Sequence, residues 1–378
     1  MRVLHAVTLH SPTHAFGGPV RVALNLSRGL RARGHEARLT ALGDGFEGPL
    51  PTEVEGVPAR LFPARRMLPL GFSGITSPAL VAGAGRLVRD ADIVHVHLAR
   101  DLVTLPVALA ALRAGRPLVL QTHGMVDPSD RLLARVLDGL AVRRVLRGAA
   151  AVLCLTDHER RGLEAVAPAG PGRPLRLTRL VNGVPAQEPR PAPSGAPRIL
   201  YAARLQARKR PRDFVAAVPE ILRHHPAAEF VVAGPDEGEL ASVQALIDRL
   251  GLGERVHCPG ALSAGEMLAE LRRAHVYVLP SVDEPFPMSV LEALAAGTPA
   301  VVTRSNGLAR DIAEAGAGRV VDGPAGLAPA VRELLDPAVG VPASAAARKL
   351  AAEAFSMDSV LDTLVGVYEG CTGSARGV

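Results

Sequence analysis

Short, continuously apolar runs alternate with longer amphipathic segments along the whole chain, and this alternation constrains the fold more than any other feature. Such runs are typical of strands that are buried on both faces, and the segments between them are typical of helices. In the first half of the chain we predict strands at Arg2–Thr8, Ala37–Leu42, Ile93–His97, Pro117–Thr122 and Ala150–Leu155, and helices at Pro19–Arg33, Leu102–Ala114 and Arg131–Arg147. The pattern predicts a parallel sheet with helices on both faces.

A proline-rich segment without periodicity, Pro185–Pro197, interrupts the alternation and is typical of a linker or a crossing between domains. The alternation then resumes. We predict strands at Arg198–Ala203, Glu229–Ala233, Arg255–Cys258, Val276–Pro280 and Ala300–Thr303, and helices at Arg210–His224, Glu239–Leu250, Gly265–Ala274 and Ser289–Ala296.

The 378 residues suffice for two domains of about 100–200 residues each. We therefore expect an α/β chain with two doubly wound, Rossmann-like domains. The N-terminal domain should cover residues 1–187, the C-terminal domain residues 188–356, and a tail at 357–378 should carry a last helix that packs back on the N-terminal domain. Doubly wound domains bind ligands at the carboxyl ends of their strands, so the loops that follow strands are the places to search for function.

Charge and composition exclude several classes of protein. The net charge of +6 is compatible with phosphorylated ligands, an anionic membrane surface or nucleic acid. Aromatic residues make up only 3%, which leaves few platforms for base stacking, so no nucleic-acid partner is expected. No run of about 20 apolar residues or secretory signal is visible. The widely spaced Cys154, Cys258 and Cys371 argue against disulfides and zinc ribbons, so we expect a cytoplasmic protein.

The strongest chemical signal is the segment 278–303, VLPSVDEPFPMSVLEALAAGTPAVVT, in which a strand, a loop and a helix follow one another. It places Glu284 in the loop and Glu292 in the helix. Carboxylates are strong acceptors for paired hydroxyls, so one could hold ribose and the other a sugar, while the helix N-terminus offers amides to a phosphate. The alternative is structural, because Ser289-x-x-Glu292 also matches a capping box and Glu284 could be a solvated loop residue.

A second signal is a basic loop after the strand at 198–203, with Arg204 and Lys209. Fixed cations stabilise the negative charge that develops on a departing diphosphate. The alternative is a solvated basic loop. Gly17 and Gly18 precede a helix and permit a close approach to an anion, although an ordinary turn would also have such a pair.

Histidines form a third group. His123 follows the strand at 117–122, where it can hydrogen-bond a sugar hydroxyl or simply pack in the loop. His95 and His97 alternate along one strand and point to one face. No further ligand is evident at a suitable spacing, so we expect no metal and assign these two a structural role or one at the acceptor edge.

These segments together resemble the retaining glycosyltransferases of family 4, whose signature has two glutamates separated by seven residues. The resemblance extends from Gly17-Gly18 to the C-terminal helix. It implies a GT-B fold, with two Rossmann-like domains facing each other across a cleft that holds the active site. The chain departs from the family at Pro285-Phe286-Pro287, where the family often has Gly-Phe-Gly, and proline has no amide to donate.

The resemblance also implies roles for individual residues. Arg204 and Lys209 would bind the diphosphate, Glu284 the donor sugar and Glu292 the ribose. Asn182-Gly183-Val184 would shape the hinge, and Gly83-x-Gly85 is no dinucleotide fingerprint because it lies in a predicted helix. The predicted catalytic residues are Arg204, Lys209, His123 and Glu284, and the predicted nucleotide-sugar-binding residues are Gly17, Gly18, Gly234, Phe286, Met288, Ser289 and Glu292.

The predicted activity is transfer of a sugar from a nucleoside-diphosphate sugar, with UDP as the expected nucleotide, to an acceptor hydroxyl with retention and without a metal or other cofactor. The acceptor is a glycan, a lipid-linked intermediate or a small natural product such as an aminocyclitol antibiotic precursor. The alternatives are a nucleotide-sugar epimerase with the same fold and a binding module without catalysis. The arginine-rich helix at 131–147 can rest on anionic lipid, or it is a solvated surface helix.

Overall fold

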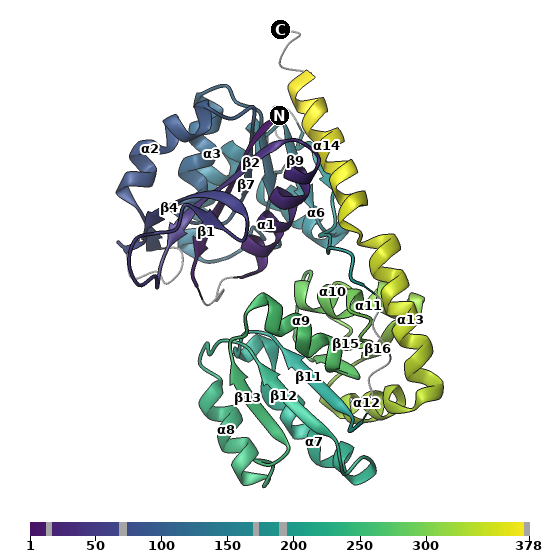
Figure 1. The fold of residues 1–378 in the computed structure, drawn as a ribbon. Coiled ribbons are helices and arrows are strands. Elements are labelled where there is room, and N and C mark those ends of the chain that lie inside the picture. The colour runs from purple at the N-terminus through teal and green to yellow at the C-terminus, as the bar shows by residue number, and fades with distance from the viewer. Residues whose placement is uncertain (13–16, 68–73, 169–173, 189–194, 374–378) are drawn as a thin grey trace. The chain divides into compact units, whose positions relative to one another are not determined.

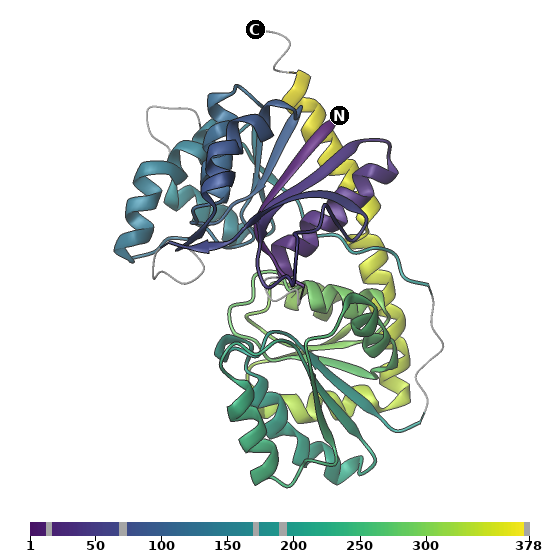
Figure 2. The ribbon, with the colours of Figure 1, turned by 60° about the vertical axis from the view of Figure 1, so that its left-hand side comes forward.

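The computed structural model describes residues 1–12, 17–67, 74–168, 174–188 and 195–373, which form two compact α/β units. Unit 1 comprises residues 1–183, with a gap at 13–15, and the C-terminal residues from 357 onwards. Unit 2 comprises residues 184–356. Figures 1 and 2 show the chain as a ribbon in two views, coloured from the N-terminus to the C-terminus.

Unit 1 is built on an eight-stranded sheet in the order β10-β9-β8-β7-β1-β2-β4-β3. Its strands pair in parallel, except for the antiparallel pair β3–β4. The strands are β1 (Arg2–His10), β2 (Glu36–Gly43), β3 (Glu53–Val54), β4 (Val57–Pro63), β7 (Ile93–His97), β8 (Leu118–Gln121), β9 (Ala151–Cys154) and β10 (Leu177–Arg179), while β5 (Arg65–Arg66) and β6 (Ile75–Thr76) form a separate ribbon.

Helices cover both faces of this sheet, because the strands are apolar on both sides. They are α1 (Gly17–Ala32), α2 (Pro78–Arg89), α3 (Thr104–Arg113), α4 (Leu132–Leu137), a π-helical turn (Asp138–Val142), α5 (Arg143–Gly148), α6 (Asp157–Val166) and α14 (Met357–Gly373). From β1, Leu4 and Ala6 join the core under α2 and α3, whereas Val7 joins the core under α1. Figures 1 and 2 show α14 alongside α1, where Leu361 contacts Gly29.

Unit 2 has a wholly parallel six-stranded sheet in the order β13-β12-β11-β14-β15-β16. Its elements are β11 (Arg198–Ala202), a 3₁₀ turn (Ala207–Lys209), α7 (Pro211–His224), β12 (Glu229–Ala233), α8 (Leu240–Arg249), β13 (Val256–Gly260), α9 (Ala264–Arg273), β14 (Val276–Leu279), α10 (Met288–Ala295), β15 (Ala300–Thr303), α11 (Ala309–Ala315), β16 (Gly318–Val321), a second 3₁₀ turn (Pro324–Gly326), α12 (Leu327–Leu335) and α13 (Pro337–Ala354). Figure 1 shows α7 and α8 on one face of the sheet and α9 and α10 on the other.

The chain passes between the units at two neighbouring points. Unit 1 ends at Gly183 and begins again at Met357, while unit 2 begins at Val184 and ends at Ser356. The Val184 amide donates to the Phe355 carbonyl at 3.0 Å, so the two ends of unit 2 are held together. The division precedes the predicted linker, of which residues 189–194 lie outside the described residues.

The structure confirms all ten predicted strands and most of the predicted helices, with shifts of a few residues at their ends. The segment predicted as a helix at 131–147 is helical from Leu132 to Gly148, with a π-helical turn between α4 and α5. Gly17 and Gly18 lie in the first turn of α1 rather than in a loop before it. All three cysteines are free, as predicted. Among the described helices, none has the length and apolar character needed to cross a membrane.

Candidate functional site

The sheet of unit 2 reverses its winding between β11 and β14, which are neighbours although some 70 residues of chain separate them. From β11 the chain moves outward to β12 and β13, and from β14 it moves the other way to β15 and β16. Such a reversal leaves a crevice at the carboxyl ends of the two central strands. Arg204 and Lys209 follow β11, and Glu284 follows β14, so the sheet order brings these three predicted residues to one place.

Lys209 and Glu284 form a buried ion pair at this crevice. The lysine Nζ contacts Glu284 Oε2, and the two residues are only 8% and 7% exposed. Arg208 Nη2 approaches the same oxygen at 3.9 Å from a more exposed position. Burial lowers the pKa of Lys209, while the Glu284 carboxylate opposes that shift. The ion pair thus joins Lys209, which the sequence predicted to bind the diphosphate, to Glu284, which it predicted to bind the donor sugar.

The loop that carries Glu284 is fixed by its backbone. The Val282 amide donates to the Arg208 carbonyl at 2.9 Å, and the Gly307 amide donates to the Glu284 carbonyl at 2.7 Å. A Cβ on Gly307 would lie 1.7 Å from the Pro285 carbonyl oxygen, so only glycine permits this approach. The glutamate side chain is therefore presented from an anchored loop.

Arg204 lies beside the loop that follows β12. Its Nη1 contacts Glu237 Oε1 at 3.0 Å and Oε2 at 3.3 Å, and the arginine side chain is 37% exposed. Gly234 in the same loop has a φ of 143°, and a Cβ there would lie 2.0 Å from the Ala203 carbonyl oxygen. Gly234 therefore lets this loop pack directly against the end of β11. Because both contacts to Glu237 use one nitrogen, the guanidinium keeps other N–H donors for an anionic ligand.

Helix α10, which carries Glu292, starts differently from the capping-box alternative. Helix α10 begins at Met288, and its N-cap is Pro287, which makes no side-chain capping bond. Ser289 is inside the first turn, with its hydroxyl 2.8 Å from that of Tyr277. The capping-box interpretation of Ser289 and Glu292 is therefore wrong. Tyr277 in turn donates to the Ala202 carbonyl at 2.7 Å, which ties α10 to the end of β11.

The first turn of α10 has the backbone amides that the sequence predicted as donors to a phosphate or sugar oxygen. The first N–H groups of a helix have no acceptor within it, so those of Met288 and Ser289 can serve a polar ligand. Phe286 is buried, with its ring against that of Phe355 at 5.8 Å, and this contact orients the loop before the helix. Glu292 lies half-buried one turn further along α10.

In unit 1, His123 follows β8 in an unusual conformation. Its φ is 50°, in the left-handed region, and Gly124 follows with a φ of 72°. The half-buried ring stacks on that of His97 at 5.1 Å, and His123 Nε2 lies 2.8 Å from His97 Nδ1. Burial lowers the pKa of His123 to about 3, so its imidazole is neutral near pH 7.

Glu159, which the sequence analysis did not single out, holds the His123 loop. Its carboxylate accepts hydrogen bonds from the Thr122 hydroxyl at 2.5 Å, the Gly124 amide at 2.7 Å and the Leu155 amide at 2.7 Å. The side chain is buried in the first turn of α6. The pattern Thr156-x-x-Glu159, typical of a helix start, was the available signal. Thr122 and Gly124, the two neighbours of His123 in the chain, are thus both held by Glu159.

Behind His123 lies a column of buried histidines. His5 Nδ1 is 3.2 Å from His97 Nε2, and His95 Nδ1 is 2.7 Å from the Tyr368 hydroxyl of α14. The rings of His95 and His97 stack at 4.7 Å on one face, which supports the structural role predicted for them. Burial lowers the pKa of His5 to about 3 and those of His95 and His97 well below their usual value.

This column includes a group with metal-ligating atoms. Among the described residues, nitrogen atoms of His5, His95 and His97 lie within 4.8 Å of one another. Hydrogen bonds to each other, to His123 and to Tyr368 already engage four of the ring nitrogens. The group contains no anionic ligand to offset a buried divalent charge. We therefore keep the prediction that the reaction uses no metal.

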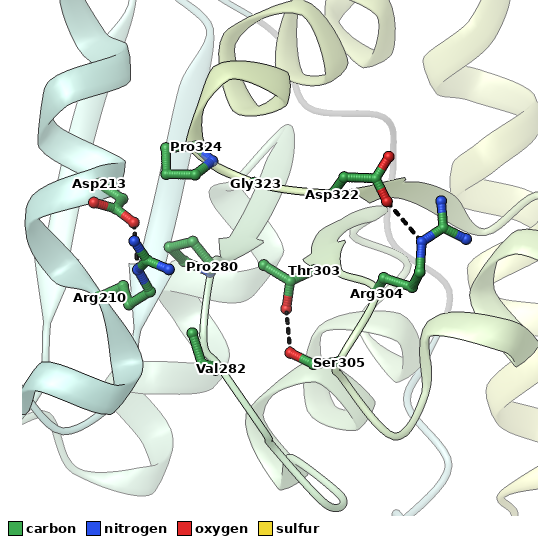
Figure 3. A pocket seen from close by; sticks show the side chains of 10 residues that line it. All are labelled: Arg210, Asp213, Pro280, Val282, Thr303, Arg304, Ser305, Asp322, Gly323 and Pro324. Atoms are coloured by element: carbon green, nitrogen blue, oxygen red, sulfur yellow. Dashed lines mark hydrogen bonds and ion pairs between the residues drawn. The ribbon is translucent and has the colours of Figure 1, made fainter.

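A cavity of about 440 Å³ lies beyond β14, β15 and β16 in unit 2, shown in Figure 3. Arg210 is held by Asp213 at 2.6 Å, and Arg304 is held by Asp322 at 2.6 Å. The two arginines that line this cavity are thus already paired with carboxylates, and we assign the cavity no ligand. It is lined by Arg210, Asp213, Pro280, Val282, Thr303, Arg304, Ser305, Asp322, Gly323 and Pro324, and the predicted site residues in the described ranges are not among them.

Comparisons with known proteins match both units. Residues 17–183 match the family model of the glycosyl transferase 4-like domain, and residues 186–349 match that of glycosyl transferases group 1. D-inositol 3-phosphate glycosyltransferase of Streptomyces avermitilis is 29% identical over 100% of this chain and 88% of its own length. Glycogen synthase of Mycobacterium tuberculosis is 34% identical over 53% of this chain, and the chain spans about half of that relative, 49%.

Solved structures share the fold. HepE of Anabaena, in complex with UDP and glucose, has a TM-score of 0.76 at 18% identity, with 97% of this chain and 98% of that chain covered. A mutant of S. aureus TarM, in complex with fondaparinux, alpha-GlcNAc-glycerol and UDP, has a TM-score of 0.77 at 10% identity, with 97% and 100% covered. These neighbours confirm the expected GT-B fold class with its two Rossmann-like domains.

Replacing Glu159 by glutamine should destabilise unit 1. The amide has one accepting oxygen where the carboxylate has two, so at least one buried donor among Thr122, Gly124 and Leu155 loses its partner. We expect the free energy of unfolding to fall by about 1–3 kcal/mol, measured by urea denaturation. Glu164→Gln, on the exposed side of the same helix, should change it by less than about 0.5 kcal/mol. Equal stability of both variants would contradict the clamp.

The buried histidines should make unit 1 sensitive to acid. Their pKa values are lower in the folded than in the unfolded protein, where they are near 6.5, so only the unfolded state gains protons as the pH falls from about 6.5 towards 3. Each such histidine should lower the free energy of unfolding by about 1.4 kcal/mol per pH unit in this window. The variant His5→Gln should show a slope shallower by that amount, measured by urea denaturation between pH 4 and 6. The exposed His257→Gln serves as the control, and an unchanged slope in His5→Gln would contradict the assignment.

Proposed function

Since the chain belongs to the family-4-type glycosyltransferases and has the GT-B fold, we propose that it transfers a sugar from a nucleoside-diphosphate sugar to an acceptor hydroxyl with retention at the anomeric carbon. The observation that carries the proposal is the Lys209–Glu284 pair at the crevice between β11 and β14. A lysine ammonium has three donors, so Lys209 can bind Glu284 and a phosphate oxygen together.

The Lys209–Glu284 pair supports a donor site at this crevice. The sugar hydroxyls lie against Glu284 and the diphosphate against Lys209 and Arg204, because the bond that breaks joins sugar to phosphate. Amides of Met288 and Ser289 face the same ligand, and Glu292 accepts from the ribose hydroxyls. Gly234 provides the close approach that a nucleotide base needs beside the end of β11.

In the proposed reaction, the acceptor oxygen bonds to the anomeric carbon on the face that the diphosphate leaves. The leaving phosphate oxygen takes the proton of the acceptor hydroxyl, so no protein nucleophile is needed. Lys209 and Arg204 stabilise the negative charge on the diphosphate, which is larger in the transition state than in the ground state. His123, whose imidazole is neutral near pH 7, is the proposed hydrogen-bonding partner of a sugar hydroxyl at the edge of unit 1.

UDP is the proposed nucleotide, because HepE was solved with UDP and with UDP-glucose. For the acceptor, the D-inositol 3-phosphate glycosyltransferase of Streptomyces avermitilis matches 100% of this chain, whereas the glycogen synthase of Mycobacterium tuberculosis matches 53% of it. We therefore test a cyclitol or cyclitol phosphate first, and a glycan or a lipid-linked intermediate second.

The activity can be tested with a panel of UDP-sugars. Without acceptor, the purified chain should release UDP slowly from one of them, and a cyclitol, cyclitol phosphate or glycan acceptor should increase that rate and yield an α-linked product from an α-linked donor. NMR of the anomeric proton gives the stereochemistry. Interconversion of sugars without release of UDP would identify an epimerase instead, and the absence of both reactions would argue for a binding module.

Replacing either cation should slow the transfer. We expect Arg204→Ala and Lys209→Ala to reduce kcat by about 10²–10³-fold, the effect of removing one charge-stabilising donor from an active site. The exposed Arg212→Ala on α7 is the matched control and should keep the wild-type rate. Wild-type rates in Arg204→Ala and Lys209→Ala would refute the roles of both residues.

Loss of stability must be separated from loss of chemistry at Lys209, because removing it leaves the Glu284 carboxylate buried without its partner. Breaking a buried pair costs about 3–5 kcal/mol, whereas replacing both partners can be neutral. The double variant Lys209→Met, Glu284→Gln should therefore recover most of the unfolding free energy that Lys209→Ala loses. Its kcat should stay low, since the phosphate donor is absent.

A further inference from the structure

Exposed apolar side chains gather on one helix of unit 1. Eight large hydrophobic residues are exposed in the described part of the chain, and half of them lie between positions 132 and 140. Leu132 is 76% exposed and Leu140 74%, with Val136 and Leu133 at 44% and 40%. Such a concentration differs from the single exposed hydrophobics that are normal on protein surfaces.

The spacing of these residues places them on one stripe. Leu132, Val136 and Leu140 follow one another at intervals of four, which keeps them on one side of a helix. The opposite side is buried: Asp138 is only 5% exposed and forms an ion pair with Arg100 at 2.8 Å. The stripe therefore does not belong to the core of unit 1, although it consists of core-type side chains.

The exposed stripe ends inside the π-helical turn at Asp138–Val142, which contains both the exposed Leu140 and the buried Val142. The amide of Arg143 donates to the Asp138 carbonyl, which is the wider hydrogen bond of a π turn. From the last residue of this turn onwards, the apolar residues Val142, Val145 and Leu146 are at most 1% exposed and join the core. The helix thus buries one apolar face and leaves another uncovered.

Arginines accompany the exposed stripe. Five arginines lie between residues 131 and 148, and all are exposed: Arg131, Arg135, Arg143, Arg144 and Arg147. The one acidic residue in this stretch, Asp138, is buried against Arg100. Asp127 and Asp130 precede the helix, so the surface keeps a net positive charge.

We propose that the face formed by Leu132, Leu133, Val136 and Leu140 with its flanking arginines docks on an anionic lipid bilayer. Apolar side chains of an interfacial helix enter the boundary between headgroups and acyl chains, while arginines bind lipid phosphates from the polar side. The face combines both elements on one helix. This docking goes beyond the transfer reaction and does not depend on it.

Charge argues against the two other occupants. In a symmetric contact with a second copy, the same arginine-rich patch would meet itself, and like charges would oppose the association. A nucleic acid would engage the arginines but leave the leucine stripe in water, because phosphate contacts do not bury apolar side chains. A lipid surface accommodates both.

Sedimentation of the full chain with vesicles tests the proposal. We expect binding to vesicles of phosphatidylcholine with about one third phosphatidylglycerol, weaker binding to phosphatidylcholine alone, and a decrease at high salt. Leu132→Ser with Leu140→Ser should reduce the partition coefficient by about tenfold or more. Arg131→Gln with Arg135→Gln should reduce it by about tenfold for anionic vesicles only.

A matched control uses exposed hydrophobics elsewhere. Val81→Ser with Val341→Ser, on α2 and α13, should leave vesicle binding unchanged. Failure of the wild type to bind anionic vesicles, or wild-type binding by the Leu132 and Leu140 variant, would overturn the proposal. So would a wild-type dimer that this variant dissociates, since the face would then join two copies. Circular dichroism verifies that each variant is folded, and the transfer assay is read independently.

Discussion

The pairing of β11 with β14 is the constraint on which the candidate site depends. These strands lie far apart in the sequence, and only their adjacency at the reversal of the sheet brings a cation after one strand next to a carboxylate after the other. The parallel order makes both loops emerge at the same edge. The Lys209–Glu284 pair is thus a product of topology, and the backbone bonds from Val282 to Arg208 and from Gly307 to Glu284 fix its position.

The Lys209–Glu284 pair adds little to the free energy of unfolding, because the cost of taking two charges out of water roughly offsets their attraction. Its presence in a buried crevice is easier to explain by ligand binding than by stability. The same conclusion does not extend to the exposed pairs, such as Arg304 with Asp322, which contribute little. Burial is therefore what separates the site from the many arginine–carboxylate contacts on the surface.

Much of the fold could be predicted from the sequence, because buried parallel strands leave a strong apolar signal and their order along the chain follows from it. The candidate site could be predicted only as a set of separate loops. Which residues touch depends on strand order and on local turns. No sequence pattern states that Lys209 meets Glu284, or that Arg204 meets Glu237.

Three matches to one pattern illustrate this limit. Ser263-x-x-Glu266 forms a full capping box, with both reciprocal bonds present. Thr156-x-x-Glu159 caps α6 through the threonine, but the glutamate turns to the His123 loop instead. Ser289-x-x-Glu292 does not form a capping box, because Ser289 lies inside α10, whose N-cap is Pro287. The pattern indicates a helix start, whereas the neighbouring chain decides where the carboxylate goes.

The two units handle charge in opposite ways. In unit 1 the buried polar side chains near the carboxyl edge are histidines whose pKa values are lowered by burial, so they remain neutral at physiological pH. In unit 2 the corresponding edge carries Arg204 and the Lys209–Glu284 pair. A neutral imidazole can exchange hydrogen bonds with a sugar hydroxyl but cannot offset a departing diphosphate. In the proposed reaction, stabilisation of the leaving group therefore falls to the cations of unit 2, because the neutral histidines of unit 1 cannot supply it.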